Sequence, residues 1–299
     1  MAQFTQRLLW AGHRLATISG IVALTSSFAI PTAQGAISST TAATKQTAAE
    51  ALIAEDLLEP RFCPENLAPM LDAIVAQPHF TTANWGIAIY PLEADHLLYA
   101  HNAKQKLIPA SNIKLMTSAA AMQAIAAHSP AALWDFRHDL NLVNRDSNNA
   151  HADELLQRMG GQNRVRTMLE PLGVDPNSYV QADGSGLSRR NQAEPAAFVT
   201  LLKGMHEGDE SGLFYESLPV GGVTGTLRHR FEHTAAHGKV HAKTGTLRGV
   251  RALSGYLETD QYGTVVFSII VNQPGQSGRV MLDAIDDMVL LMTQLEPCD

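Results

Sequence analysis

Ser111 and Lys114, which together could carry out acyl transfer, stand three positions apart in PASNIKLMTSAAAM, the stretch from Pro109 to Met122. Residues three apart share one face of a helix, so the two side chains would be neighbours. A serine hydroxyl is a strong nucleophile only when a base takes its proton, and lysine is such a base only when burial lowers its pKa. The apolar residues that follow Lys114 would provide that burial. Taken alone, however, the pattern fits better a capped helix whose lysine stem lies along its surface.

Two later motifs supply the groups that the first one lacks. Ser147-Asn148-Asn149 offers a hydroxyl that can pass a proton to a leaving amine and an amide that can hold a substrate. Lys243-Thr244-Gly245 lies in a predicted strand, where the lysine can bind a carboxylate while an extended peptide lies alongside. The three patterns each occur once, in this order, so their combination predicts a serine acyl-transfer site.

The same residues also have structural explanations. Ser147-Asn148-Asn149 precedes a predicted helix and could cap it, and Lys243-Thr244-Gly245 could be only a turn at a strand end. DGSGLSR, from Asp183 to Arg189, is expected to be a turn that shapes the edge of the site. Histidines recur every four residues from 229 to 241, but Gly238 interrupts any helix there, so we expect no metal site.

The pattern of apolar residues predicts an α/β (α+β) fold. Its centre is an antiparallel five-stranded sheet flanked by the N- and C-terminal helices, with a helical region that carries the Ser-x-x-Lys helix. The expected strands are 85–92, 97 onward, 239–247, 250–260 and 263–273, and the expected helices are 64–75, 111–128, 150–160, 194–208 and 278–295.

Composition bounds the location and partners of the chain. The 299 residues carry a formal net charge of −7 without a basic cluster, which argues against a nucleic-acid partner. Arg7 and Arg14 precede an apolar run over 15–30, and no acidic residue occurs before Glu50. We therefore expect a signal peptide at 1–36, a flexible leader at 37–60 and one catalytic domain at 61–299, located in the periplasm. An uncleaved N-terminal anchor is the alternative, and it would be the only contact with a membrane.

Cys63 and Cys298 are the only cysteines, and both lie in the part that would be exported. Domain termini are often close in space, and an oxidising compartment permits a disulfide. We predict that the two cysteines are joined, with two free thiols as the alternative.

Five blocks of the chain resemble the penicillin-binding protein 4 type D-alanyl-D-alanine carboxypeptidase/endopeptidase family. They are LLYAHNAKQKLIPASNIKLMTSAAAM, NRDSNNAHADELLQRMG, DGSGLSRRN, SLPVGGVTGTLRHRF and KVHAKTGTLRGVRALSGYL. The resemblance implies the penicillin-recognising fold and an acyl-serine enzyme that needs no cofactor. It also implies that the partners are peptidoglycan stem peptides, cleaved at D-alanyl bonds, and β-lactam antibiotics, which acylate the serine.

The resemblance further implies a role for each motif residue. Ser111 would be the nucleophile and Lys114 its base, while Lys243 would lie on the carboxylate side of the substrate. The backbone N–H groups of Ser111 and Thr246 would form the oxyanion hole. The remaining site residues that it implies are Ser147, Asn149, Thr244 and Gly245.

The chain departs from the family between its first two motifs, where members of the family carry two inserted domains. Only the 32 residues 115–146 separate Lys114 from Ser147, so the insert is missing. WDFRHDL, at 134–140, resembles the strand that leads into the insert. Two alternatives to the peptidase stay open: a serine β-lactamase, although no Glu-x-x-x-Asn loop is evident, and a non-catalytic peptidoglycan-binding relative.

Overall fold

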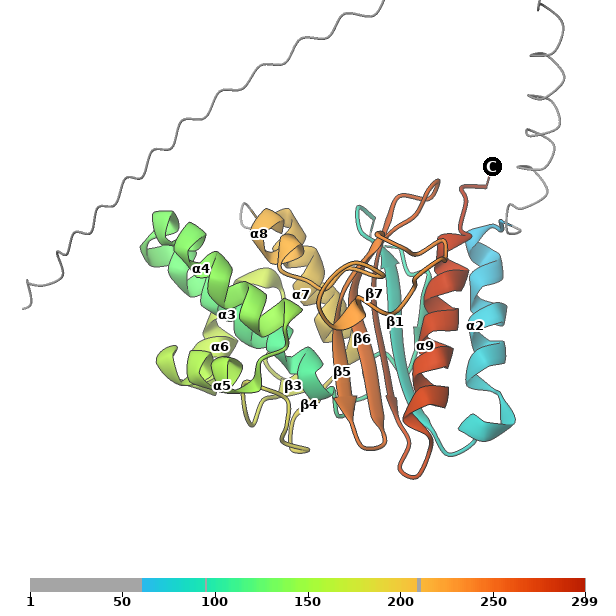
Figure 1. Cartoon of the computed structure of the whole chain (residues 1–299), viewed down its shortest axis with the longest axis horizontal. Coiled ribbons are helices and arrows are strands. Elements are labelled where there is room, and N and C mark those ends of the chain that lie inside the picture. The colour runs from blue at the N-terminus through green and yellow to red at the C-terminus, as the bar shows by residue number, and fades with distance from the viewer. Residues whose placement is uncertain (1–60, 95, 209–210, 299) are drawn as a thin grey trace, which may run out of the picture. The chain divides into compact units, whose positions relative to one another are not determined.

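A five-stranded antiparallel sheet forms the centre of the computed structural model, which describes residues 61–94, 96–208 and 211–298 (Figure 1). The strand order is β2-β1-β7-β6-β5, which confirms the predicted sheet and places β5, the strand of Lys243, at one edge. The strands are β1 (Asn84–Pro91), β2 (Tyr99–His101), β5 (Val240–Leu247), β6 (Val250–Glu258) and β7 (Thr264–Asn272).

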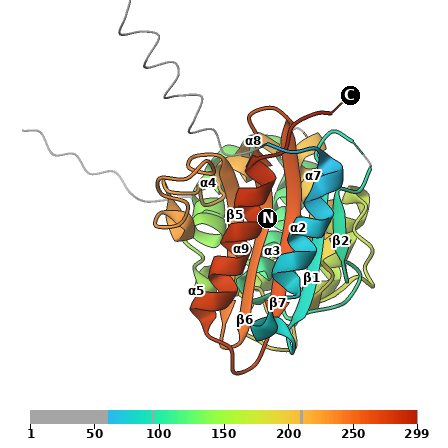
Figure 2. The ribbon, with the colours of Figure 1, turned by 90° about the vertical axis from the view of Figure 1, so that its right-hand side faces the viewer.

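The two helices nearest the chain termini cover one face of the sheet. Figure 2 shows α2 (Leu67–Val75) and α9 (Gly278–Thr293) side by side in front of the strands. Met281, Ile285 and Met288 recur at helical spacing in α9 and are buried against apolar strand residues. Because helices cover both faces, β7 is buried almost along its whole length, and six of its nine residues are apolar.

A helical region covers the other face, and α3 (Ile113–His128) runs through its middle (Figure 1). All residues from Ile113 to Met122 are buried, because α3 packs against the sheet and against other helices. The other helices of this region are α4 (Leu133–Leu140), α5 (Asn149–Arg158), α6 (Gln162–Leu169), α7 (Pro195–Glu207) and α8 (Ser211–Glu216), and two short strands, β3 (Tyr179–Val180) and β4 (Gln192–Ala193), pair beside them.

The segment WDFRHDL is a helix, so the expected resemblance to a strand was wrong. It forms most of α4, which buries Leu133, Phe136 and Leu140 at the i, i+3, i+7 spacing of one helical face. A π-helical turn, Asn141–Arg145, continues directly from α4 and ends just before the second motif.

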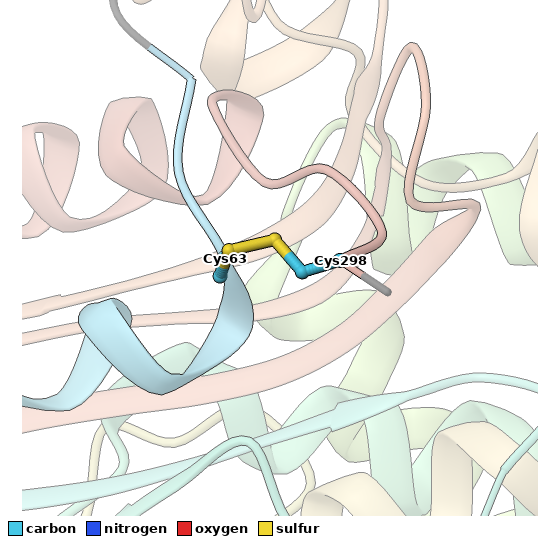
Figure 3. Close-up of a disulfide and its surroundings, with 2 residues drawn as sticks. All are labelled: Cys63 and Cys298. Atoms are coloured by element: carbon cyan, nitrogen blue, oxygen red, sulfur yellow. A yellow bond between two sulfur atoms is a disulfide. The ribbon is translucent and has the colours of Figure 1, made fainter.

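The first and last described segments are joined as predicted. Cys63 and Cys298 form a disulfide with their Cα atoms 5.5 Å apart (Figure 3). Beside it, the Phe62 N–H donates to the Gln294 carbonyl at 3.0 Å, and the Glu296 N–H donates to the Phe62 carbonyl at 3.2 Å. The disulfide therefore ties the start of α2 to the end of α9.

The expected signal peptide at 1–36 and leader at 37–60 lie outside the described residues. Within the residues that are described, no helix is both long enough and apolar enough to span a bilayer.

Candidate active site

Ser111 and Lys114 meet at the start of α3. Ser111 lies in a 3₁₀ turn, Ala110–Asn112, that leads into the helix, and Lys114 follows in the first helical turn. The Lys114 Nζ atom is 3.0 Å from the Ser111 Oγ atom. Asn112 fixes this turn to the sheet, because its buried side-chain amide donates to the Ser254 hydroxyl of β6 at 2.7 Å.

Lys114 is held by groups that can only accept hydrogen bonds. Besides Ser111, its Nζ atom donates to the Asn149 Oδ1 atom at 2.8 Å and to the Ser185 carbonyl oxygen. The side chain is fully buried, and burial lowers its pKa from 10.5 to about 8, although the carboxylates of Asp153 and Asp183 partly oppose the shift. In this structure the Ser111 hydroxyl donates to the Ser185 carbonyl at 3.3 Å. A neutral Lys114 amine needs two N–H groups for its two acceptors, which leaves its lone pair for the Ser111 proton when that hydroxyl turns toward it. This arrangement can deprotonate Ser111.

The residues of the second motif have different roles: Asn148 is structural, and Ser147 contacts a lysine of the site. The Asn148 side chain caps α5 by accepting a hydrogen bond from the His151 N–H at 2.9 Å, so the capping explanation holds for this residue. Ser147, by contrast, has a positive φ of 54°, a conformation that only a constrained backbone maintains in a serine. Its hydroxyl accepts from the Lys243 Nζ atom at 2.9 Å. Ser147 binds Lys243 and Asn149 binds Lys114, so the motif contacts both lysines of the site.

Lys243 is enclosed by the protein. Its side chain is fully buried, and its Nζ atom donates to the Ser147 hydroxyl and to the Thr244 carbonyl, the latter at 3.2 Å. Burial, with a smaller contribution from the charge of Lys114, lowers the pKa of Lys243 well below its usual value. This geometry suits a proton relay with Ser147 better than direct binding of a carboxylate.

An open cleft of about 230 Å³ lies next to this network. Ser111 and Ser147 line it from the helical region, and Thr244, Thr246 and Arg251 line it from β5 and β6. Lys243 is not among the lining residues. The nucleophile therefore faces the cleft together with threonines and an arginine of the sheet.

Gly245 faces the Ser111 turn. A Cβ atom at Gly245 would lie 2.4 Å from the Pro109 carbonyl oxygen. No side chain can fit there without moving one of the two backbones. The absent side chain of the third motif therefore sets the distance between β5 and the start of α3.

The edge position of β5 exposes backbone donors to the cleft. The Ala242 N–H points away from β6, since it donates to the Pro219 carbonyl at 3.0 Å. Backbone direction alternates along a strand, so the N–H groups of Thr244 and Thr246 point toward the same outer edge. Thr246 and Ser111 both line the cleft. The two residues of the expected oxyanion hole therefore lie at the same cleft.

The DGSGLSR loop packs directly on the nucleophile turn. A Cβ atom at Gly186, which has a φ of +88°, would lie 2.1 Å from the Ala110 carbonyl oxygen. The loop is shaped by two carboxylates: Asp153 accepts from the N–H groups of Gly184 and Ser185, both at 2.8 Å, and Asp183 accepts from its own loop. The expected site-shaping turn therefore also supplies the Ser185 carbonyl that binds Lys114.

Sequence reasoning did not find the positioning role of four residues, although two of them, Asp183 and Ser185, lie in the turn that was expected to shape the site. Asn112 and Ser185 are both buried in the structure. In the sequence, the only signal for either residue is that it lies inside a recognised motif. Asp183 opens the DGSGLSR block, whereas nothing near Asp153 in the sequence distinguishes it from a surface residue of a helix.

The regularly spaced histidines lie outside this network. His229 contacts Glu232 at 3.2 Å, and the ring of His241 stacks on Tyr215 with centroids 4.2 Å apart. Across the described part of the chain, no three His, Cys, Asp or Glu residues form a group that could hold a metal ion.

The model of the family described as D-Ala-D-Ala carboxypeptidase 3 (S13) matches residues 67–130 and 123–295. The chain belongs to this S13 family. The two matched stretches meet at 123–130, between Lys114 and Ser147, which is the interval in which the sequence predicted that the inserted domains are missing. All three motifs lie within the matched stretches.

Two curated relatives match about half of the chain. The D-alanyl-D-alanine carboxypeptidase of Actinomadura sp. (strain R39) is 40% identical over 183 residues, which cover 56% of this chain and 33% of the relative. The penicillin-sensitive carboxypeptidase A of Dictyostelium discoideum is 35% identical over 174 residues, which cover 52% of this chain and 33% of the relative. The matched part of the chain thus spans about one third of the length of these relatives.

The TLA-1 extended-spectrum β-lactamase has a similar fold. Its structure superposes with a TM-score of 0.64 at 17% identity and covers 78% of this chain and all of its own. At this identity the likeness establishes the penicillin-recognising fold alone.

Proposed function

We propose that the chain is a serine D-alanyl-D-alanine carboxypeptidase/endopeptidase that acts on peptidoglycan stem peptides through an acyl-serine intermediate. The observation that carries the proposal is the Ser111 hydroxyl, 3.0 Å from a buried Lys114 amine whose pKa is about 8, at the wall of an open cleft. A buried amine with a lowered pKa beside a serine is an activated nucleophile and base. Membership of the S13 family and the names of the matched relatives support the same reaction.

Acylation begins when neutral Lys114 takes the proton of Ser111. The Ser111 Oγ atom then attacks the carbonyl carbon of the penultimate D-alanine, and the carbonyl oxygen becomes an oxyanion. The N–H groups of Ser111 and Thr246 are proposed to stabilise this oxyanion, because both residues line the cleft and the Thr246 N–H points to the strand edge.

Collapse of the oxyanion breaks the C–N bond and releases the terminal amino acid. The leaving nitrogen takes a proton from the Ser147 hydroxyl. The proton that Lys114 took from Ser111 then replaces it on the Ser147 oxygen. Lys243 keeps the Ser147 hydroxyl in position through their 2.9 Å hydrogen bond. Water then attacks the acyl-serine ester and releases the shortened peptide, which regenerates Ser111.

A β-lactam would acylate Ser111 by the same steps, since its strained amide takes the place of the D-alanyl bond. We propose slow hydrolysis of that ester rather than β-lactamase activity. Rapid deacylation requires a base that activates water at the ester, and none of the described residues that line the cleft is an Asp or Glu. The carboxylates of Asp153 and Asp183 accept backbone hydrogen bonds of the DGSGLSR loop instead.

We also propose that the chain is exported to the periplasm. Peptidoglycan lies outside the cytoplasmic membrane, and the Cys63–Cys298 disulfide suits an oxidising compartment. The basic and apolar pattern of residues 1–36 supports a signal peptide.

Covalent labelling with a fluorescent penicillin tests the proposal. The purified chain should form a labelled adduct that survives denaturation, and Ser111→Ala should form none. The native chain should also release D-alanine from an acetylated peptide that ends in D-Ala-D-Ala. Absence of labelling in the folded native chain would favour the non-catalytic peptidoglycan-binding alternative, and rapid turnover of a chromogenic cephalosporin would favour a β-lactamase.

A further inference from the structure

Two apolar side chains of the C-terminal helix line the cleft that contains Ser111. Leu282 and Ile285 belong to α9, which packs against the sheet, and they stand three positions apart on one face of the helix (Figure 2). Ile285 is buried, whereas Leu282 is half-buried and exposes part of its side chain. An apolar surface of this kind offers no hydrogen bond to a substrate, so its effect is on the size of what lies beside it.

A loop on the other side of the same region is attached to α9. Arg230 of this loop lines the cleft and forms an ion pair with Asp286, the residue that follows Ile285, with the Arg230 Nε atom 3.0 Å from the Asp286 Oδ1 atom. Thr226 of the loop also lines the cleft, and its hydroxyl accepts a hydrogen bond from the Thr244 hydroxyl at 2.7 Å. We call the four lining residues of the loop and the helix the end wall: Thr226, Arg230, Leu282 and Ile285.

Close backbone packing holds both parts of the end wall in place. A Cβ atom at Gly278, the first residue of α9, would lie 1.8 Å from the Arg251 Nη2 atom of β6. A Cβ atom at Gly225, which has a φ of +58°, would lie 2.5 Å from the Arg145 carbonyl oxygen, just before Ser147 in the chain. The helix and the loop therefore have little room to move closer to the sheet or to the second motif.

The end wall lies on the side of the leaving group. Ser147, the proposed proton donor to the leaving nitrogen, is bonded to Lys243 at 2.9 Å, and Thr226 is bonded to the next residue of the strand, Thr244. Thr246, which belongs to the expected oxyanion hole, lies two residues further along β5. A leaving residue whose nitrogen faces Ser147 is therefore placed between Ser147 and the end wall.

We propose that the end wall restricts the leaving residue to a small side chain, which makes the chain a carboxypeptidase that releases D-alanine rather than an endopeptidase. The cleft measures about 230 Å³, below the roughly 300–1,000 Å³ that is usual for small-molecule sites. The carboxypeptidase reaction places one methyl group beside the wall, whereas the endopeptidase reaction must accommodate the rest of a second stem peptide. This inference rests on the proposed peptidase function and names the class of substrate.

Two peptides that differ only in the leaving side chain test the inference. Both are acetylated and keep the terminal carboxylate, and they end in D-Ala-D-Ala and in D-Ala-D-Leu. The native chain should cleave the first with a kcat/KM at least about tenfold higher, an effect that a few methylene groups produce in an apolar pocket. Leu282→Ala should raise kcat/KM on the D-Leu peptide by about tenfold and change it on the D-Ala peptide by less than about threefold. Leu282→Phe should increase the preference for D-alanine.

Leu291→Ala is the matched control. Leu291 is also a half-buried leucine of α9, and it does not line the cleft, so this variant removes the same atoms from the same helix. It should leave the ratio of the two kcat/KM values unchanged. An equal change of the ratio in Leu291→Ala would mean that a weakened helix, and not added space, alters the selectivity, and this would overturn the inference.

A cross-linked pair of stem peptides tests the endopeptidase reaction directly. The native chain should hydrolyse the cross-link at least about tenfold more slowly than it releases D-alanine from the acetylated D-Ala-D-Ala peptide, and Leu282→Ala should narrow the difference. Equal native rates on the two substrates would contradict the inference.

The outcomes separate this inference from the proposed function. A native chain that cleaves the D-Ala and D-Leu peptides equally well, or a preference that Leu282→Ala does not change, would overturn the inference and leave the peptidase proposal in place. A native chain that neither cleaves the D-Ala-D-Ala peptide nor reacts with penicillin would overturn the peptidase proposal itself, and the inference with it.

Discussion

The Nζ atom of Lys114 lies 3.0 Å from the Ser111 hydroxyl, while two oxygen atoms that can only accept hydrogen bonds hold it from other directions. One of these, the Ser185 carbonyl, belongs to the DGSGLSR loop, and the other belongs to Asn149 of the second motif. Because neither can donate, the neutral amine has its lone pair left for the serine proton. The lysine is therefore oriented as a base by residues that are distant in the sequence.

The rate of acylation should rise with pH through about 8. Only the neutral form of Lys114 can accept the Ser111 proton, and burial lowers its pKa from 10.5 to about 8. The neutral fraction, and with it the rate, increases tenfold per pH unit below that value and levels off above it. The second-order rate of penicillin labelling between pH 6 and 9.5 measures this. A rate that is independent of pH across this range would contradict the role of Lys114.

Replacement of Asp153 should move that profile to lower pH. The Asp153 carboxylate favours the charged form of Lys114 and so raises its pKa, and Asp153→Asn removes that effect. The asparagine oxygen can still accept from the N–H groups of Gly184 and Ser185, which both bind a single oxygen of Asp153. The midpoint of the labelling profile should decrease.

Glu154→Gln is the control for this shift. Glu154 is the exposed neighbour of Asp153 and pairs with Arg158, at 3.7 Å on the helix surface. Its replacement changes the net charge equally and should leave the midpoint in place. A midpoint that stays the same in Asp153→Asn, or that increases, would show that the carboxylate does not act on Lys114.

A methyl group at Gly245 should abolish most of the acylation activity. Gly245→Ala places a Cβ atom 2.4 Å from the Pro109 carbonyl oxygen and forces the Ser111 turn away from β5. A displacement of about 1 Å at a reacting group reduces rates by about a hundredfold. Gly212→Ala is the comparison, because no atom of the described residues lies within 4 Å of the added atom there. Gly212→Ala should retain native labelling rates, and equal rates in both variants would contradict the spacing argument.

The strands and most helices were predictable because their apolar periodicity is strong. The run TVVFSIIVN has no polar interruption longer than one residue, and α9 repeats apolar positions at helical spacing, so each defines its element locally. WDFRHDL was misjudged because a family resemblance outweighed the local pattern, in which Phe136 and Leu140, together with the preceding Leu133, mark a helical face. The three motifs indicated the candidate site because they occur together and in one order, although each of them alone has a structural explanation.

The positions of the groups around the motifs could not be predicted. Asp153 shapes the loop that bears Ser185, about thirty residues away in the chain, and such a contact leaves no local trace. The positive φ of Ser147 and the enclosure of Lys243 also follow from tertiary packing alone. For the same reason, the sequence could not show that the buried Lys243 amine is bonded to Ser147, a residue that lines the cleft.

Removal of the disulfide should reduce stability and leave the chemistry intact. Cys63 and Cys298 are 235 residues apart, and in the loop-entropy model a cross-link of this span stabilises the folded chain by about 5.5 kcal/mol. The Cys63→Ser/Cys298→Ser double variant should therefore show a free energy of unfolding in urea that is lower by about that amount. Its penicillin labelling rate at 25 °C should match that of the native chain, because the bridge joins α2 to the end of α9 and contacts none of the cleft residues. The single variants should be as unstable as the double variant, since either one opens the loop. A loss below about 1 kcal/mol would mean that the Phe62 hydrogen bonds to Gln294 and Glu296 hold the two segments together without the bridge.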